Sequence, residues 1–455
     1  MAFLSSPVRA FEQDLPPAAK QWALAILEAA LEAVNPLRAV KCALQLRGDI
    51  LHIGPARYDL AAYEHIYVLG AGKASAAMAQ ALEDVLGERI TAGWINVKEG
   101  YTAPTRSITI HEAGHPVPDM RSVAGSQEIA AFARAAGPQD LVFCLISGGG
   151  SALMTLPVHG ITLADIGTLT EALLRCGATI NEINTVRKHL SQLKGGRLSQ
   201  LSQPAQIVSL ILSDVIGSPL DVIASGPTSP DSTTFAQAIE VLRRHQLLEH
   251  VPSTIVQHLK RGMEGLVPET PKAGDSVFES TQNVIIASNE HAAQAALDKA
   301  HELGMNGLLL STYVEGEARE VGKVFGAIAR QVAISGHPIA RPACIVAGGE
   351  TTVTVCGSGL GGRSQELALA TAPSIAGLHD VAVIGLGTDG TDGPTDAAGA
   401  VVTGQTVQRA MEKQQSILGA LLDNDAYHLF EALGDLIITG PTNTNVNDLM
   451  FVLAF

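Results

Sequence analysis

Short β-branched runs alternate with Ala- and Leu-rich segments along most of the chain. Apolar positions that recur at roughly every third and fourth residue predict helices, and short apolar runs bounded by turn residues predict strands. The clearest helix is expected in residues 74–86, where Met78, Ala81 and Leu82 share one face with their apolar neighbours. The alternation of the two patterns is typical of an α/β fold.

Some of the predicted strands in the first half, such as LVFCLIS at residues 141–147, are almost continuously apolar. Such runs are typical of a parallel sheet that helices cover on both faces. We therefore expect a Rossmann-like α/β domain in residues 1–260. Its predicted strands are residues 65–70, 92–97, 107–112, 141–147 and 207–213.

A second α/β domain is expected in residues 277–455, after a Pro- and Gly-rich linker at about 261–276. A helical segment at about 17–34 could pack on either domain. Two α/β domains predict an active site in the cleft between them. The expected strands of the second domain are residues 283–290, 307–312, 343–349, 351–356, 381–387, 399–404 and 435–440.

Composition and charge exclude several classes of function. The formal net charge of −15 and the aromatic content of 4% argue against nucleic-acid and anionic-membrane partners. The five cysteines lack the close spacing of a disulfide framework or a zinc site. Residues 1–20 lack the pattern of a signal peptide, and acidic residues and Pro219 interrupt the longest apolar stretch. We predict a soluble cytoplasmic protein, for which a homodimer is possible.

A glycine-rich turn, LGAGKAS, follows the first predicted strand. Gly70 and Gly72 allow a tight turn, and Lys73 stands at the start of the next helix. Backbone N–H groups at a helix start bind anions, and a lysine adds a point charge that suits a phosphate or carboxylate. The alternative is an ordinary strand–helix turn with a surface lysine.

A second glycine loop, LISGGGSAL, follows the strand at 141–147. Consecutive N–H groups in such a loop can form a nest for phosphate or carboxylate oxygens. The loop does not match the G-x-S-x-G pattern of a nucleophile elbow, so a hydrolase is set aside. The candidate binding residues here are Ser147, Gly148, Gly149, Gly150 and Ser151.

A third loop, GSGLGGRSQE, matches G-x-G-x-x-G and precedes a predicted helix, which is the local signature of a dinucleotide-binding turn. Arg363 follows the glycines directly, and a guanidinium binds two anionic oxygens at once. The arginine favours a transferring phosphoryl group over the pyrophosphate of NAD. The glycines concerned are Gly357, Gly359, Gly361 and Gly362.

Acidic residues follow several predicted strands, where they could hold Mg²⁺ beside ATP phosphates. Asp214 and Glu350 each stand at or just after a strand end, and Asp389 opens the loop GTDGTDGPTD. Within that loop, a solvated turn is the stronger interpretation for Asp392. The residues leave open whether Asp214 or Asp389 holds the metal or orients the attacking hydroxyl.

Two further segments carry candidate chemistry. HEAGHPVPD matches the zinc motif H-E-x-x-H, but its glycine and prolines argue against the helix that this motif needs. His115 could line a cleft or order the loop. Residues 180–198 predict one helix, on which Arg187 and Lys194 either border an anion site or belong to a solvated basic face.

Eight motifs, in this order, resemble the class II glycerate kinases, the glycerate 2-kinases that carry a C-terminal MOFRL domain. The similarity runs from about Val68 to Val452. The motifs are LGAGKAS, HEAGHPVPD, LISGGGSAL, NTVRKHLSQLKGGRL, LSDVIGSPLDVIASGPTSPD, GGETTVTVCGSGLGGRSQELAL, GTDGTDGPTDAAGA and TNTNVNDL.

The resemblance implies two α/β domains and phosphorylation of D-glycerate to 2-phosphoglycerate by ATP with a divalent metal, which we expect to be Mg²⁺. It also implies catalytic roles for Lys73 and Arg363, which would neutralise charge on the γ-phosphoryl oxygens. Members of the family are also called hydroxypyruvate reductases, so an NAD(P)H-dependent reductase is the alternative. A sugar-acid or nucleotide sensor is the lesser one.

Overall fold

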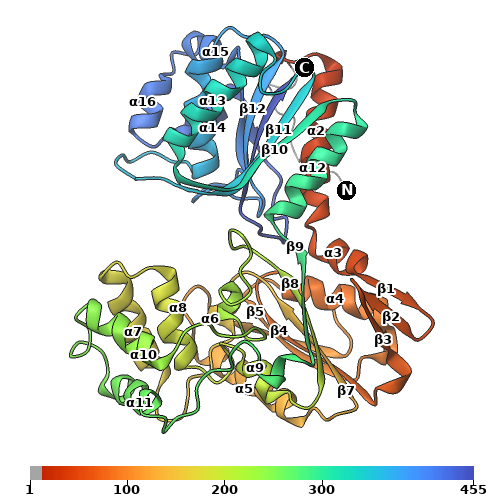
Figure 1. Cartoon of the computed structure of the whole chain (residues 1–455). Helices are drawn as coiled ribbons and strands as arrows, with labels where there is room; N and C mark the ends of the chain where they lie inside the picture. Colours follow the sequence, from red (N-terminus) through yellow and green to blue (C-terminus); the bar gives the residue numbers. More distant parts are fainter. Residues whose placement is uncertain (1–12) are drawn as a thin grey trace. The chain divides into compact units, whose positions relative to one another are not determined.

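The chain is described for residues 13–455 in a computed structural model (Figure 1). It divides into two compact units, which are described separately. Residues Pro36–Ile286 form the central unit, and residues 13–35 together with Ala287–Phe455 form the terminal unit. The expectation about a signal peptide concerns residues 1–20, most of which lie outside the described part. No helix in residues 13–455 has the length and apolar character to cross a membrane.

The central unit contains a six-stranded sheet in the order β6-β5-β4-β7-β8-β9. The pairings β6-β5, β5-β4, β4-β7 and β7-β8 are all parallel. Every residue of β7 is buried, as its continuous apolar sequence predicts. The first five predicted strands are therefore confirmed. The bounds are β4 His65–Ala71, β5 Ala92–Lys98, β6 Ile108–Ala113, β7 Asp140–Ile146, β8 Gln206–Leu212 and β9 Thr281–Ala287.

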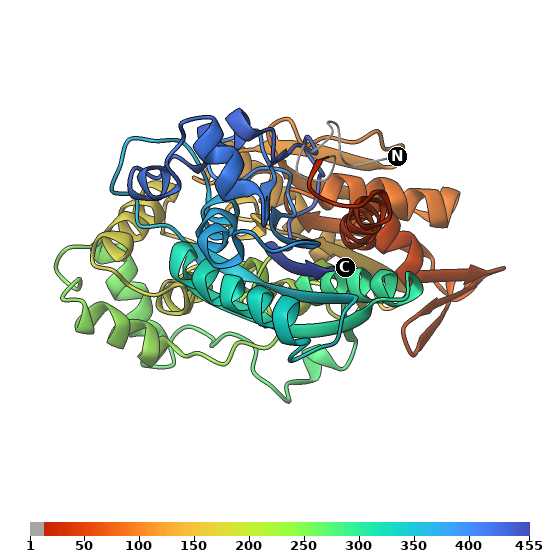
Figure 2. The ribbon, with the colours of Figure 1, turned by 90° about the horizontal axis from the view of Figure 1, so that it is seen from above.

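Helices cover this sheet, and a separate group of helices packs around its own core, which includes Leu169, Val186 and Phe235 (Figure 1). A small antiparallel sheet, β1-β2-β3, extends away from the six-stranded sheet of the same unit (Figure 2). The sheet-covering helices are α4 Ser75–Leu86, α5 Met120–Ala135, α6 Gly150–Leu153 and α9 Arg197–Leu201, and α3 Pro36–Ala43 packs on α4. The separate group is α7 Leu163–Arg175, α8 Ile180–His189, α10 Phe235–Arg244 and α11 Ser253–Met263. The small strands are β1 Leu44–Arg47, β2 Ile50–Ile53 and β3 Ala56–Asp59.

The terminal unit contains a mixed six-stranded sheet in the order β10-β11-β15-β12-β13-β14. Its last long strand, β15, inserts between β11 and β12 and is antiparallel to both. Helices α13 and α14 cover one face, and α2 and α12 pack together on the other (Figure 1). The strands are β10 Asn306–Glu317, β11 Ala343–Thr352, β12 Val381–Gly387, β13 Gly399–Thr403, β14 Leu436–Ile437 and β15 Asp448–Ala454. The helices are α2 Pro17–Ala33, α12 Asn289–Glu302, α13 Ala318–Ser335, α14 Arg363–Ile375, α15 Thr406–Glu412, α16 Ile417–Leu422 and α17 Ala426–Leu433.

The compact units differ from the expected domain boundaries at both ends. Helix α2 belongs to the terminal unit, because its buried alanines and leucines pack on α12. Residues 261–276, expected as a linker, lie within the central unit, where the Asp231 N–H donates to the Pro271 carbonyl at 2.9 Å. The strand expected at 283–290 is β9, which joins the first sheet. An apolar run identifies a strand but not the sheet that it joins.

Two expected strands of the second domain are wrong in large part. Only Thr351 and Thr352 of residues 351–356 lie in a strand, because the following N–H groups find side-chain acceptors instead of a strand partner. Of residues 435–440, only Leu436 and Ile437 pair in the sheet. Strand β15 and the small sheet β1-β2-β3 were not predicted.

Candidate active site

The parallel sheet of the central unit brings four predicted features to one edge. Lys73 follows β4, the loop Gly148–Gly150 follows β7, Asp214 follows β8 and His115 follows β6. Carboxyl ends of parallel strands meet at the same edge of a sheet, where ligands bind in α/β proteins. These four features are called the Lys73 cluster below.

Glycines are required at the centre of the Lys73 cluster. A Cβ on Gly148 would overlap the Asp214 carboxylate, and a Cβ on Gly149 would lie 2.8 Å from the His115 ring and 3.6 Å from Lys73 Cγ. Gly149 also has a φ of 82°, in the left-handed region that favours glycine. The glycines therefore allow two charged groups and an imidazole to approach one loop.

The backbone N–H groups of the first glycine turn donate hydrogen bonds to acceptors within the protein. The N–H of Gly72 donates to the Asn96 carbonyl, that of Lys73 to the Gly148 carbonyl at 2.9 Å, and that of Ala74 to Ser147 Oγ at 3.0 Å. Gly70 and Gly72 instead allow β4 to approach β7 closely, since a Cβ on either would overlap Leu145 or Ser147. The ammonium of Lys73, which has no ion-pair partner within residues 13–455, is the group left for a ligand.

His115 lines a pocket beside the loop Gly148–Gly150 and is neutral at physiological pH. Burial, followed by the positive charges of Lys73 and Lys98, lowers the pKa of His115 to about 4. His111 and Glu112 lie in strand β6, which confirms that the H-E-x-x-H match is not helical. Asp119 caps helix α5 through a hydrogen bond to the Ser122 N–H at 3.0 Å.

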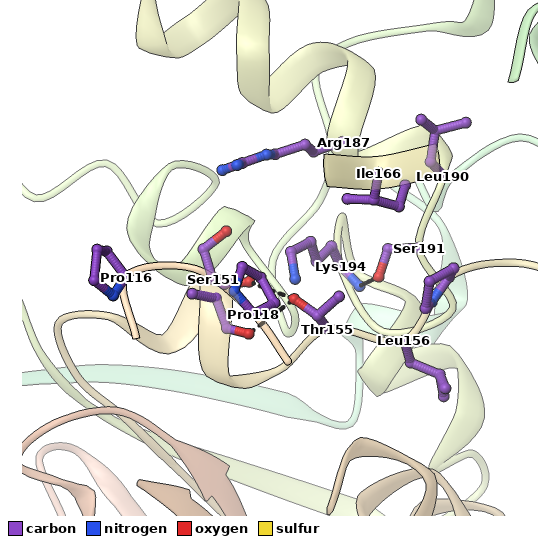
Figure 3. Close-up of a pocket in the computed structure, with 12 residues that line it drawn as sticks. Pro116, Pro118, Ser151, Thr155, Leu156, Ile166, Arg187, Leu190, Ser191 and Lys194 are labelled. Atoms are coloured by element: carbon purple, nitrogen blue, oxygen red, sulfur yellow. Dashed lines mark hydrogen bonds between the residues drawn. The ribbon is translucent and has the colours of Figure 1, made fainter. Parts of the chain in front are cut away.

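Two pockets adjoin the loop Gly148–Gly150. The larger has a volume of about 230 Å³ and is lined by His115, Asp214 and Arg187, among others. The smaller, of about 50 Å³, is lined by Arg187 and Lys194 (Figure 3). Both pockets include Ser151, Ala152 and Arg187 in their walls.

The single helix expected at 180–198 is wrong in its second half. Helix α8 ends at His189, and Ser191 then forms an isolated bridge with Pro157. Lys194 therefore lies in a loop, and the turn of the chain rather than helical spacing brings it to the same pocket as Arg187. Neither side chain belongs to a solvated basic face, since Lys194 is only 4% exposed and Arg187 lines the same pocket.

In the terminal unit, Arg363 is the first residue of helix α14, as expected, and is held by two carboxylates. Its Nε donates to Asp448 Oδ2 at 2.6 Å, and a terminal nitrogen donates to Glu350 Oε1 at 2.7 Å. Glu350 follows Gly349 in β11, and Gly349 is the register partner of Asp448 in β15. Burial by itself lowers the pKa of Arg363, but the two acids outweigh this effect and raise the pKa above its ordinary value.

The third glycine loop also uses most of its N–H groups within the protein. Gly357 donates to Asn424 Oδ1 at 3.0 Å, Gly359 to the Asp423 carbonyl at 2.9 Å and Leu360 to Asp425 Oδ1 at 2.9 Å. This loop is consequently a poor match for the expected phosphate cradle. Its glycines allow close packing against residues 423–425.

The Asp392 carboxylate lies at the start of α14, where the sequence predicts that an anionic group of a ligand binds. Its carboxylate accepts from the Ser364 N–H at 3.1 Å and the Gln365 N–H at 2.8 Å. Burial raises the pKa of Asp392 to about 6, against the effect of these hydrogen bonds. The interpretation of Asp392 as a solvated turn residue is wrong, because the side chain caps the helix in a buried position.

A pocket of about 610 Å³ lies in front of Arg363 in the terminal unit. The glycine loop contributes Gly359, Gly361 and Gly362 to its wall. Asp389 contributes a half-buried carboxylate that also accepts from the Thr391 N–H at 3.1 Å. The other acidic residues of the wall are Glu366, Asp392 and Asp448.

The sequence interpretation missed the role of Asp448. Its motif, TNTNVNDL, was recognised, but the apolar run that follows was not read as a strand. The run DLMFVLA was the available signal, since a buried strand with an acid at its first position carries that acid to a sheet edge.

Comparison with known proteins gives the family. Residues 22–260 match a domain of unknown function (DUF4147), and residues 343–448 match the MOFRL family. A glycerate 2-kinase of Pyrococcus horikoshii is 40% identical over 94% of this chain and 96% of its own length. The chain belongs to the glycerate 2-kinase family.

The fold of the glycerate 2-kinase family is also matched in three dimensions. The crystal structure of glycerate kinase from Thermotoga maritima aligns with a TM-score of 0.87 at 39% identity, covering 97% of this chain and all of that one. A protein of Agrobacterium vitis that is 42% identical over 85% of this chain and 86% of its own length is named as a hydroxypyruvate reductase. The two names within one family define the alternatives for function.

Proposed function

We propose that this protein transfers the γ-phosphoryl group of ATP to the 2-hydroxyl of D-glycerate, giving 2-phosphoglycerate and ADP. The observation that carries the proposal is similarity over nearly the whole chain to proteins named as glycerate 2-kinases. The hydroxyl oxygen attacks the γ-phosphorus as the bond from that phosphorus to the bridging oxygen of ADP breaks.

Lys73 and Arg363 stabilise the negative charge that spreads over the transferring phosphoryl oxygens. Support for Lys73 comes from its ammonium, which has no ion-pair partner within residues 13–455 and lies beside a glycine loop. Support for Arg363 comes from Asp448 and Glu350, which hold its guanidinium in one orientation while two of its five N–H donors stay available. Fixed donors aimed at developing charge are among the largest catalytic contributions in enzymes.

Asp214 and Asp389 take different roles in this proposal. Asp214 belongs to the Lys73 cluster, so it orients the acceptor hydroxyl and accepts its proton. Asp389 lines the acidic pocket of the terminal unit and serves the metal. Asp214 lies near cationic side chains, whereas Asp389 lies in a wall with other acidic residues, and this difference supports the division of roles.

The residues fit Mg²⁺ bound together with a nucleotide. Within residues 13–455 no group of three or more His, Cys, Asp and Glu side chains could hold a metal alone. Mg²⁺ usually takes one or two carboxylates and completes its shell with water and phosphate oxygens, and Asp389 offers such a carboxylate. When bound, Mg²⁺ would neutralise charge on the nucleotide phosphates.

The alternative is an NAD(P)H-dependent hydroxypyruvate reductase, which the name of the Agrobacterium vitis relative supports. A dinucleotide would place its pyrophosphate at the N-terminus of α14, beside the glycines. The Asp392 carboxylate and the internally bound loop N–H groups argue against that placement.

One pair of assays distinguishes the two activities. We expect ADP formation with D-glycerate, ATP and Mg²⁺, and a product that enolase dehydrates directly, which identifies 2-phosphoglycerate. We expect no oxidation of NADH or NADPH with hydroxypyruvate. Oxidation of NADH without ADP formation would replace the kinase by the reductase.

A further inference from the structure

A buried lysine, Lys194, and a half-buried arginine, Arg187, share one small pocket of the central unit without a carboxylate partner. The ammonium of Lys194 donates to the Met154 carbonyl at 2.6 Å, and the guanidinium of Arg187 donates to Thr170 Oγ1 at 3.1 Å. Neither forms an ion pair with any residue in 13–455. A buried charge is unfavourable unless it is paired, so this arrangement calls for an anion.

The same segment contains a buried lysine whose role is structural. Lys188 is 2% exposed, and its ammonium lies 3.3 Å from both Asp221 and Asp231. The fold thus neutralises Lys188 with two acids but leaves Lys194, six residues further along, with a carbonyl partner alone. Burial, followed by the charge of Arg187, lowers the pKa of Lys194 to about 7, which a bound anion would reverse.

The pocket around these cations has room for a carboxylate but not for a nucleotide. Its volume is about 50 Å³, enough for roughly four water-sized groups. Figure 3 shows Arg187 extending from α8 on one side, Ser151 and Thr155 on the other, and Lys194 between them. The apolar part of the wall comprises Pro116, Pro118, Leu156, Pro157, Ile166 and Leu190.

The pocket is continuous in its lining with the proposed acceptor site. Arg187 and Ser151 also line the larger pocket, which reaches His115 and Asp214 of the Lys73 cluster. An acid with its carboxylate between Arg187 and Lys194 would therefore lie next to the pocket that Asp214 lines. A hydroxyl next to that carboxylate could then reach the larger pocket, where phosphorylation is proposed to occur.

We propose that Arg187 and Lys194 bind the carboxylate of the acceptor, and that this pocket selects short 2-hydroxy acids over neutral alcohols. The proposal rests on the proposed function and adds to it the group by which the acceptor is recognised. ATP phosphates are assigned elsewhere, so the two cations contribute to acceptor binding and not to nucleotide binding.

The test compares D-glycerate with its neutral amide, glyceramide, in the wild-type protein and in Arg187→Gln, Lys194→Met and Arg175→Gln. Arg175 is an exposed residue in the last turn of α7 and serves as the control. We expect the KM for D-glycerate to rise on the order of 10- to 100-fold in the first two variants. The KM for ATP should change little, and the preference for the acid over the amide should largely disappear.

Binding without turnover separates this proposal from the proposed function. Calorimetric titration of the wild-type protein with D-glycerate and with glyceramide tests the pocket even if no ADP forms. Equal binding of acid and amide, or a rise in the KM for ATP instead of D-glycerate, would overturn the assignment. Because Lys194→Met could disturb folding, two variants that keep the charges, Arg187→Lys and Lys194→Arg, serve as further tests. Both should retain part of the preference for the acid. Loss of this preference in a variant with normal thermal unfolding would also contradict the proposal.

Discussion

The two units present pockets of opposite charge. In the central unit, Lys73, Arg187 and Lys194 adjoin pockets whose one acid is Asp214. In the terminal unit, Arg363 faces a pocket lined by Glu366, Asp389, Asp392 and Asp448. The first arrangement suits a free anion such as a carboxylate, whereas the second suits an anion that arrives with its own cation, such as a nucleotide with Mg²⁺.

Both units resemble each other in how they use glycine. The first and third glycine loops direct most of their N–H groups to acceptors in the same unit, so these two loops hold side chains in place and do not form open anion nests.

The largest effect is expected from Lys73→Ala in the Lys73 cluster of the central unit. Loss of the ammonium should lower kcat on the order of 100- to 1,000-fold, because a fixed positive group no longer meets the developing charge. Thermal unfolding should stay normal, since Lys73 has no ion-pair partner within residues 13–455. The exposed Lys260, at the end of α11, provides a matched Lys→Ala control, and near-normal turnover in Lys73→Ala would refute the mechanism.

Arg363→Ala should lower kcat by a similar factor and, unlike Lys73→Ala, also destabilise the protein. Removal of the guanidinium leaves Asp448 buried without its partner, which should reduce the free energy of unfolding by about 3 kcal/mol, since Arg363 itself is partly exposed. Chemical denaturation of both variants measures the difference. Equal stability of the two variants would show that the Arg363–Asp448 pair contributes little.

Asp389→Asn tests the acidic pocket. The Mg²⁺ concentration for half-maximal activity should rise about 10-fold, because one hard oxygen ligand loses its charge. The KM for D-glycerate should stay within about 2-fold of the wild-type value at saturating Mg²⁺. If Asp214→Asn shifts the Mg²⁺ requirement instead, the two carboxylates have the opposite roles.

The last prediction concerns pH in the pocket that Arg187 and Lys194 line. The pKa of Lys194 is near 7 in the free protein and rises when an anion binds, so D-glycerate should bind more weakly as the pH increases above about 7. The dissociation constant should increase up to 10-fold per pH unit, as measured by calorimetry without ATP. Arg187 stays charged and His115 stays neutral over this range, so Lys194→Met should abolish the dependence.

The sequence predicts the central sheet and the convergence at its edge well, because continuous apolar runs indicate parallel strands and their carboxyl ends must meet. Lys73, Gly148–Gly150 and Asp214 follow from that rule. The hydrogen-bond partners of the third glycine loop could not be predicted from that rule, since Asn424 lies more than sixty residues from Gly357. Lys194 reaches its pocket through an irregular turn, which periodicity could not predict.

Helix α2 has a consequence for how the chain is assembled. The central unit is one continuous segment, so it can become complete during synthesis before the rest of the chain has emerged. The terminal unit cannot, because residues 13–35 must wait for the last strand, β15, to be made. A fragment that starts at residue 287 would lack α2 and expose the apolar surface of α12, so recombinant expression of this unit would require residues 13–35 to be fused to it.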